Sequence, residues 1–255
     1  MTSGLSRQGG AAILSDRDRA IIGLVGQFKQ QTTCQLAVLG LGLPPSHTSV
    51  KRVLARLVVG RYLARIPRPV GGMGGGSAQY VYQLGRAGHR LLAREGSYWA
   101  YRSVNEHTLA IADSYLALKQ TEDRGGLTVI RFQTEPSCHL SVADVQLTPD
   151  AYVELGVIAP AARFEFWFEI DRGTEHDKKI QGKCIRYWHA YSSPQWDRPY
   201  FPYVLFIVPD ERRRAEITRV IRAGPQEAQA LFYVCLSSEV TKVIHSFVLT
   251  EVETH

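Results

Sequence analysis

The stretch that decides the N-terminal fold is SHTSVKRVLARLVVGRYLARIPRPVGGMGGGSAQYVYQL, residues 46–84. The apolar residues of its first part have the spacing of one buried helical stripe: Val50, Val53, Leu54, Leu57 and Val58. Gly60 is expected to end this helix. Two alternating, strand-like segments follow at 62–68 and 79–84, and the glycine-rich run 71–76 lies between them. A helix followed by a hairpin with a glycine-rich tip predicts the second half of a winged-helix domain.

Two more helices are expected before this stretch, which completes the three helices of a winged helix. Ser15 is the expected N-cap of the first helix, because acidic residues follow it in the first turn. Thr32 or Thr33 is expected to cap a shorter second helix, and Ser46 the third. The glycine-rich run could be mistaken for a nucleotide-binding loop, but it matches no such pattern and lies between strands rather than before a helix.

Charge is distributed very unevenly along the chain. From Arg19 to Arg94 there are 11 Lys and Arg residues and no Asp or Glu. A solvated surface normally mixes both signs, so the missing carboxylates indicate a polyanionic partner, double-stranded DNA. The alternative is a basic domain whose charges only keep it soluble. The residues expected to contact DNA lie on the polar face of the third helix and near the hairpin: His47, Thr48, Ser49, Lys51, Arg52, Arg56, Arg61, Arg65 and Arg68.

The sequence predicts a tail at 1–14, the winged-helix domain at 15–96 and a second domain at 97–255. In the second domain a helix is expected at 106–119. Further along, strands are expected at 127–132, 151–155, 163–170, 203–208 and 230–235, and helices at 175–189 and 210–222. This order predicts an α/β domain with a mixed central sheet, so the whole chain combines α+β and α/β architecture.

Three carboxylates are expected to meet at one end of that sheet. Asp150 precedes one strand, while Glu169 and Asp171 end the next, where residues two apart share a face. Clustered carboxylate oxygens are what Mg²⁺ or Mn²⁺ requires, so the three residues are candidate metal ligands. The alternative is that Asp150 is a turn residue and the other two form a solvated strand end.

A helix that Thr174 is expected to cap follows the carboxylates. It carries Lys179, Lys183 and Tyr187 at intervals of four residues, so that the three share one helical face. If this face packs toward the carboxylates, it offers two ammonium groups and a phenol to a phosphate. The aromatic run 187–203 that continues from this helix has two interpretations, core packing, which the pattern favours, and the stacking of unpaired bases.

The carboxylate pattern also resembles a known superfamily. Pro149-Asp150 followed by Glu169-x-Asp171 resembles the PD-(D/E)XK nucleases. With the basic winged helix, the PDAYVEL and FEIDRGTE segments and Lys183-x-x-x-Tyr187, most of residues 15–250 resembles the replication-relaxation family of bacterial plasmids and other mobile elements. The resemblance implies a restriction-endonuclease-like second domain and a protein of DNA relaxation or replication, with metal-dependent DNA nicking as the implied activity.

By analogy with these nucleases, each carboxylate and its neighbours receive a role. Asp150 and Glu169 would hold the metal ion, and Asp171 would be a third ligand or orient a water molecule. Lys183 would contact phosphate or water, and Tyr187 would donate a supporting hydrogen bond. The nuclease pattern, however, has a lysine where this chain has Asp171. The alternative is therefore a non-catalytic DNA-binding regulator or assembly factor with a degenerate nuclease fold.

Composition limits the remaining classes. No apolar run approaches the roughly 20 residues needed to cross a bilayer, and the N-terminus lacks the layout of a secretory signal, so a cytoplasmic protein is expected. The four cysteines lie far apart without CxxC pairs, which argues against a zinc site or a disulfide framework. Besides DNA, the expected partners are a second copy of the chain and other proteins of the mobile element, and no membrane.

Overall fold

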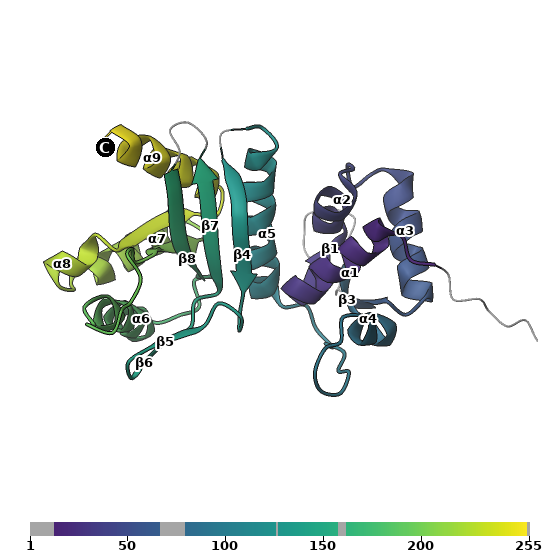
Figure 1. The fold of residues 1–255 in the computed structure, drawn as a ribbon, viewed down its shortest axis with the longest axis horizontal. Coiled ribbons are helices and arrows are strands. Elements are labelled where there is room, and N and C mark those ends of the chain that lie inside the picture. The colour runs from purple at the N-terminus through teal and green to yellow at the C-terminus, as the bar shows by residue number, and fades with distance from the viewer. Residues whose placement is uncertain (1–12, 67–79, 126, 158–161, 254–255) are drawn as a thin grey trace, which may run out of the picture. The chain divides into compact units, whose positions relative to one another are not determined.

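The computed structural model describes residues 13–66, 80–125, 127–157 and 162–253, with side chains described as far as residue 247. It combines helices with a mixed five-stranded sheet and two smaller sheets. The chain divides into two compact units, unit 1 (Met1–Val104) and unit 2 (Asn105–His255), which are described separately here (Figure 1).

Unit 1 packs its helices, α1 to α4 among the described residues, on a small antiparallel sheet. Its elements are α1 (Asp16–Phe28), β1 (Gln30–Thr32), α2 (Thr33–Leu41), α3 (Thr48–Val59), β2 (Leu63–Ile66), β3 (Val81–Leu84) and α4 (Arg86–Leu91). The strand order is β1-β3-β2, and both pairings are antiparallel. Apolar residues from α1, α2, α3 and β2, such as Ile21, Leu36, Leu54 and Leu63, form one buried core. Hydrophobic burial along the stripes that the sequence shows therefore holds the three helices together.

The N-cap residues observed in unit 1 agree with those predicted from the sequence for α1 and α2 but not for α3. Ser15 and Thr32 are both N-caps, each in a capping box with the residue three positions on. The N-cap of α3 is His47 rather than Ser46, so that prediction is wrong by one residue. The Nδ1 atom of His47 accepts a hydrogen bond from the backbone N–H of Ser49 at 3.2 Å. The cap has to stand directly before the first helical residue, Thr48, and only His47 does.

Strand β1 was not predicted. It is three residues long, and its partner β3 lies about fifty residues away in sequence, so no local periodicity indicates it. Gln30 and Gln83 face each other in the register of this pairing. The Gln30 side chain donates to the carbonyl of Ser103 at 3.0 Å, and the Gln83 side chain exchanges hydrogen bonds with the backbone of Tyr101. Two buried amides thus fasten the end of unit 1 to its sheet.

Unit 2 is built on the five-stranded sheet. The strands of this sheet are β4 (Thr128–Thr134), β7 (Ala151–Val157), β8 (Ala162–Ile170), β9 (Tyr203–Val208) and β10 (Phe232–Leu236). Two further strands, β5 (Leu140–Val142) and β6 (Val145–Leu147), form a separate two-stranded sheet. Its helices are α5 (Glu106–Glu122), α6 (Asp177–Tyr191), α7 (Glu211–Arg222), α8 (Gln226–Gln229) and α9 (Val240–Glu253). The sheet order is β10-β9-β8-β7-β4, with β10, β9 and β8 parallel and the β8-β7 and β7-β4 pairs antiparallel. The predicted mixed sheet is confirmed.

Strand β8 separates two layers of side chains by its alternation. Phe166 and Phe168 point to one side, where Phe166 lies against Phe247 of α9 at 5.6 Å between ring centroids. Trp167 and Glu169 point to the other side, where Trp167 packs in one cluster with residues of α6 and α7 and Glu169 contacts Lys183 of α6. The carboxylates at positions 169 and 171 therefore lie on the face that α6 and α7 cover.

Several boundaries differ from the prediction. Helix α6 begins at Asp177 after His176, so Thr174 is not its cap, and it runs two residues beyond the predicted end. The hairpin of β5 and β6 and the helices α8 and α9 were not predicted. The β2-β3 connection, which holds the glycine-rich run and Arg68, lies outside the described residues.

Candidate functional site

The described residues among those predicted to contact DNA lie on the polar face of α3, at its N-cap, and on β2 and the turn before it. Those that are exposed are His47, Thr48, Lys51, Arg52, Arg56, Arg61 and Arg65, and Ser49 is partly exposed. The opposite face is buried, as the apolar stripe requires, with Val58 only partly covered. The guanidinium of Arg65 lies 4.4 Å from the ring centroid of Tyr80. The amphipathic helix therefore presents its polar and basic residues away from the core of unit 1.

Arg56 differs from its neighbours because it is paired within the protein. Its Nη2 atom lies 2.6 Å from Oδ1 of Asp18, whose side chain is 1% exposed. Burial raises the pKa of Asp18, but the hydrogen bond from Arg56 and those of the capping box outweigh it and leave the pKa below its ordinary value. Arg56 thus ties α3 to the first turn of α1, and the free cations of this helix are Lys51 and Arg52, for neither of which an ion pair is found in the described part of the chain.

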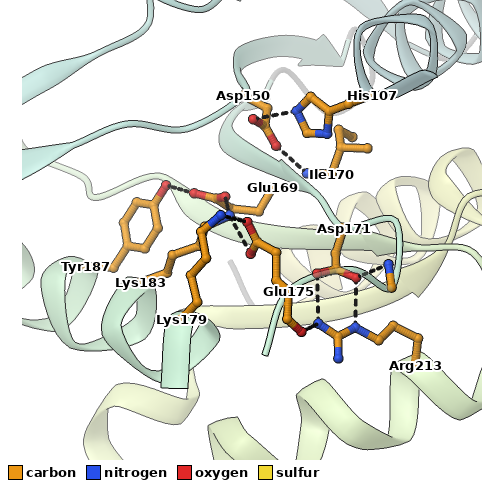
Figure 2. A network of polar contacts seen from close by, with 11 residues as sticks. His107, Asp150, Glu169, Ile170, Asp171, Glu175, Lys179, Lys183, Tyr187 and Arg213 are labelled. Atoms are coloured by element: carbon orange, nitrogen blue, oxygen red, sulfur yellow. Dashed lines mark hydrogen bonds and ion pairs between the residues drawn. The ribbon is translucent and has the colours of Figure 1, made fainter. Parts of the chain in front are cut away.

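In unit 2, a network of polar contacts lies where β7 begins and β8 ends (Figure 2). Asp150 precedes β7, and its backbone N–H donates to the carbonyl of Phe168 on β8 at 3.0 Å. One carboxylate oxygen, Oδ2, accepts the backbone N–H of Ile170 at 2.6 Å, and the other, Oδ1, lies 2.9 Å from Nε2 of His107. This hydrogen bond outweighs burial and raises the pKa of His107 above its ordinary value. Asp150 is therefore fixed by the neighbouring strand and paired with α5.

Glu169 lies at the centre of the network and is 2% exposed. Its Oε2 atom is 2.7 Å from Nζ of Lys183, and its Oε1 atom accepts a hydrogen bond from the hydroxyl of Tyr187 at 2.6 Å. Burial raises the pKa of Glu169 to about 7, and the nearby Asp150 adds to this effect while Lys183 opposes it. Burial lowers the pKa of Lys183, but its carboxylate neighbours outweigh burial, and the net pKa stands above its usual value.

Asp171 makes a separate pair with α7 (Figure 2). Its two oxygens accept Nε and Nη2 of Arg213 at 2.7 and 2.9 Å, a bidentate arrangement in which the carboxylate is 1% and the guanidinium 8% exposed. Oδ1 also accepts the backbone N–H of Gly173 at 2.6 Å. Gly173 has a φ of 78°, a left-handed conformation that suits glycine and lets the chain turn back on itself here.

Glu175 links the two pairs. Its carboxylate lies 2.5 Å from Nζ of Lys179 and 3.0 Å from Nζ of Lys183, and its backbone carbonyl accepts Nη2 of Arg213 at 2.6 Å. The segment between β8 and α6 is therefore held by side chains of two helices, Lys179 and Lys183 of α6 and Arg213 of α7. The predicted face of α6 does turn toward the carboxylates, with Lys183 and Tyr187 on Glu169 and Lys179 on Glu175.

This arrangement does not fit a divalent metal ion. A metal needs several carboxylate oxygens free to converge on one point, together with room for water. Here both oxygens of Glu169 contact Lys183 and Tyr187, and both oxygens of Asp171 contact Arg213. Among the described residues, no group of three or more His, Cys, Asp and Glu side chains is placed to hold a metal. Glu169 and Asp171 are instead each paired with a cation of the chain, Lys183 and Arg213, and Asp150 is hydrogen-bonded to His107.

Three members of the network were not found from the sequence. His107 comes from α5, which precedes the first strand of the sheet, and Arg213 comes from α7, which follows the fourth. Neither has a local signal, because each contributes only once its helix is packed on the sheet. Glu175 did have one, as it stands four residues before Lys179 and so predicts an ion pair on a helix.

Comparison with known proteins gives one match. A model of the replication-relaxation family matches residues 22–203, a span that covers most of unit 1 and unit 2 as far as the first residue of β9. No curated protein and no solved structure matches the chain. Within the described residues, no helix has both the length and the apolar character that crossing a membrane requires. The chain belongs to the replication-relaxation family.

Proposed function

We propose that the protein is a DNA-binding member of this family and that α3 of unit 1 is its recognition helix. The observation that carries the proposal is the exposed basic face of α3 in a stretch from Arg19 to Arg94 without a single carboxylate. The helices α1, α2 and α3, the antiparallel strands β2 and β3 that follow them, and the sheet order β1-β3-β2 support a winged-helix interpretation of unit 1. In that arrangement the third helix enters the major groove, and the hairpin contacts the backbone.

Replacing Lys51 and Arg52 together by alanine is expected to weaken binding to a duplex oligonucleotide and to flatten its salt dependence. Each lost phosphate contact releases one counterion fewer, so the slope of log affinity against log salt falls by about 0.9 per contact. Fluorescence anisotropy over a range of salt concentrations measures both quantities. Arg102→Ala, an exposed arginine outside α3, is the matched control. An unchanged affinity and slope in the double variant would contradict the assignment of α3.

For unit 2 we propose a non-catalytic role, in which the neutralised network stabilises the fold. Glu169 and Asp171 each have a cationic partner and Asp150 is hydrogen-bonded to His107, and the described residues contain no group of carboxylates placed to hold a metal. The second candidate function is metal-dependent DNA nicking. The observation that favours it is that Asp150 and Glu169 lie at neighbouring strand ends and that Lys183 of α6 reaches Glu169, as the resemblance to nucleases implies.

A nicking assay distinguishes the two roles. Supercoiled plasmid is incubated with the protein and Mg²⁺ or Mn²⁺, and conversion to the nicked form is measured. We expect the plasmid to remain supercoiled in both metals. Nicking that requires the metal and disappears in Asp150→Ala and Glu169→Gln would refute the non-catalytic role and establish the nuclease. Nicking that survives both substitutions would indicate a contaminating nuclease, and an Arg212→Ala preparation purified in parallel controls for it.

A further inference from the structure

An aromatic cluster runs from the central sheet of unit 2 to its surface beyond α6. It begins at Trp167 of β8, which is 1% exposed. The ring of Phe201 meets Trp167 edge to face at 4.9 Å between centroids, and Trp196 meets it at 6.1 Å. Tyr191, the last residue of α6, meets Phe201 at 5.3 Å and is 46% exposed. The inner rings therefore support an outer ring that solvent reaches.

The outer part of this cluster is held in place although it is exposed. Tyr191 and Trp188 are stacked, with centroids 5.7 Å apart and an angle of 29° between their planes. Tyr200 is 78% exposed, and its backbone carbonyl accepts the indole N–H of Trp196 at 3.2 Å. Exposed rings that are supported by rings beneath them, as Tyr191 is by Phe201 and Trp188, offer a flat apolar surface on which a ligand can stack.

The charge around these rings is opposite to that of the rest of unit 2. The unit as a whole has 16 Lys and Arg against 21 Asp and Glu. Among residues 186–201, which supply the outer rings, there are however two basic residues and one acidic residue, Asp197. Arg186 and Arg198 are both exposed, and the guanidinium of Arg198 lies 5.5 Å from the ring centroid of Trp196. A locally basic surface on an acidic unit complements a polyanion.

We propose that this aromatic surface, formed by Trp188, Tyr191, Arg198 and Tyr200, binds single-stranded DNA. Every base has a π face, so unpaired bases stack on exposed rings whatever their sequence, and Arg198 accompanies the phosphates. Duplex DNA keeps its bases paired and stacked and offers these rings no equivalent contact. The proposal rests on the protein being a DNA-binding protein, but it assigns a different unit and a different form of DNA from those of α3.

The test is the affinity of the full chain for a labelled oligothymidylate in fluorescence anisotropy. Replacing Tyr191 and Tyr200 together by alanine is expected to weaken binding by roughly 5- to 150-fold for each base that loses its stacking partner. Replacing both by phenylalanine keeps the rings and should keep the affinity. Trp99→Ala removes a ring that is 76% exposed in unit 1 and should change nothing.

Arg198→Ala gives a second test that needs no change in the rings. It should weaken the binding of oligothymidylate and lower the salt slope by about 0.7, the value for one phosphate contact of a single strand. Unaltered thermal unfolding of each variant shows that the fold has been kept. The proposal would be overturned if the variant with alanine at positions 191 and 200 and the Arg198→Ala variant both bound oligothymidylate with the affinity of the wild type.

The outcomes separate this proposal from that for α3. Binding of duplex but not of oligothymidylate by the wild type overturns only the aromatic surface, whereas binding of neither overturns both proposals. If the tyrosine variant loses affinity for duplex and single strand alike, the surface is not specific for unpaired bases and the proposal fails. If that variant instead converts a dimer to a monomer in sedimentation without DNA and binds oligothymidylate as wild type does, the surface belongs to a second copy of the chain.

Discussion

Replacing Arg213 by methionine is expected to lower the free energy of unfolding of unit 2 by about 3–5 kcal/mol. The guanidinium is the bidentate partner of Asp171, and both groups are almost fully buried. Without it, Asp171 keeps a charge in a place that water does not reach, and the Glu175 carbonyl loses a donor. Urea denaturation followed by tryptophan fluorescence measures the loss, because three of the four tryptophans, among them the buried Trp167, lie in unit 2.

Arg212 provides the matched control on the same helix. It is 89% exposed and pairs only with Glu216 in the described residues, so Arg212→Met should cost at most about 1 kcal/mol. The double variant Asp171→Asn with Arg213→Met removes both charges and is expected to recover part of the loss. An Arg213→Met protein as stable as Arg212→Met would show that the buried pair does not hold the segment between β8 and α6.

Replacing Lys183 by methionine is expected to have an effect of similar size, about 3–5 kcal/mol, that depends on pH. Lys183 is the cation that faces buried Glu169, whose pKa burial already raises to about 7 from an ordinary value of 4.5. Losing the positive charge raises this pKa further. A group whose pKa is raised on folding favours the folded state below its unfolded pKa, and this contribution is lost as pH rises through its folded pKa.

The penalty in Lys183→Met should therefore be small near pH 4.5, where a neutral Glu169 needs no cation, and should grow as the pH rises through about 7 and above. Urea denaturation at several pH values measures this dependence. Lys179→Met is the control, because Lys179 is 64% exposed, contacts Glu175 rather than Glu169, and should show little loss at any pH. A penalty in Lys183→Met that does not change with pH would contradict the raised pKa of Glu169.

The helices and most strands of the chain could be predicted because their signals are local. The stripe of α3, the N-cap residues Ser15 and Thr32 and the run 203–208 all match the structure. The strands that were not predicted, β1, β5 and β6, are each three residues long, which is too short for the alternation of their own residues to indicate a strand. Their formation depends on partners that packing supplies rather than on their own residues.

The candidate site divides in the same way. Alternation along β8 predicted Glu169 and Asp171 on one face, and helical spacing predicted Lys183 and Tyr187 on one face of α6; that the two faces meet is an observation of the structure. The sequence did not determine how the carboxylates and cations pair. Only the tertiary structure joined His107 to Asp150 and Arg213 to Asp171, because both cations come from helices far away in sequence.

The sequence of this chain therefore determined which charges it carries and on which faces, since those follow from periods of two and of 3.6 residues. The tertiary structure decided which charges stay available. In the described residues Lys51 and Arg52 remain exposed on α3, whereas Arg56, Glu169 and Asp171 are taken up by partners in the chain. The physical reason is burial, because a charge removed from water has to be paired within the protein and is then no longer free to bind a ligand.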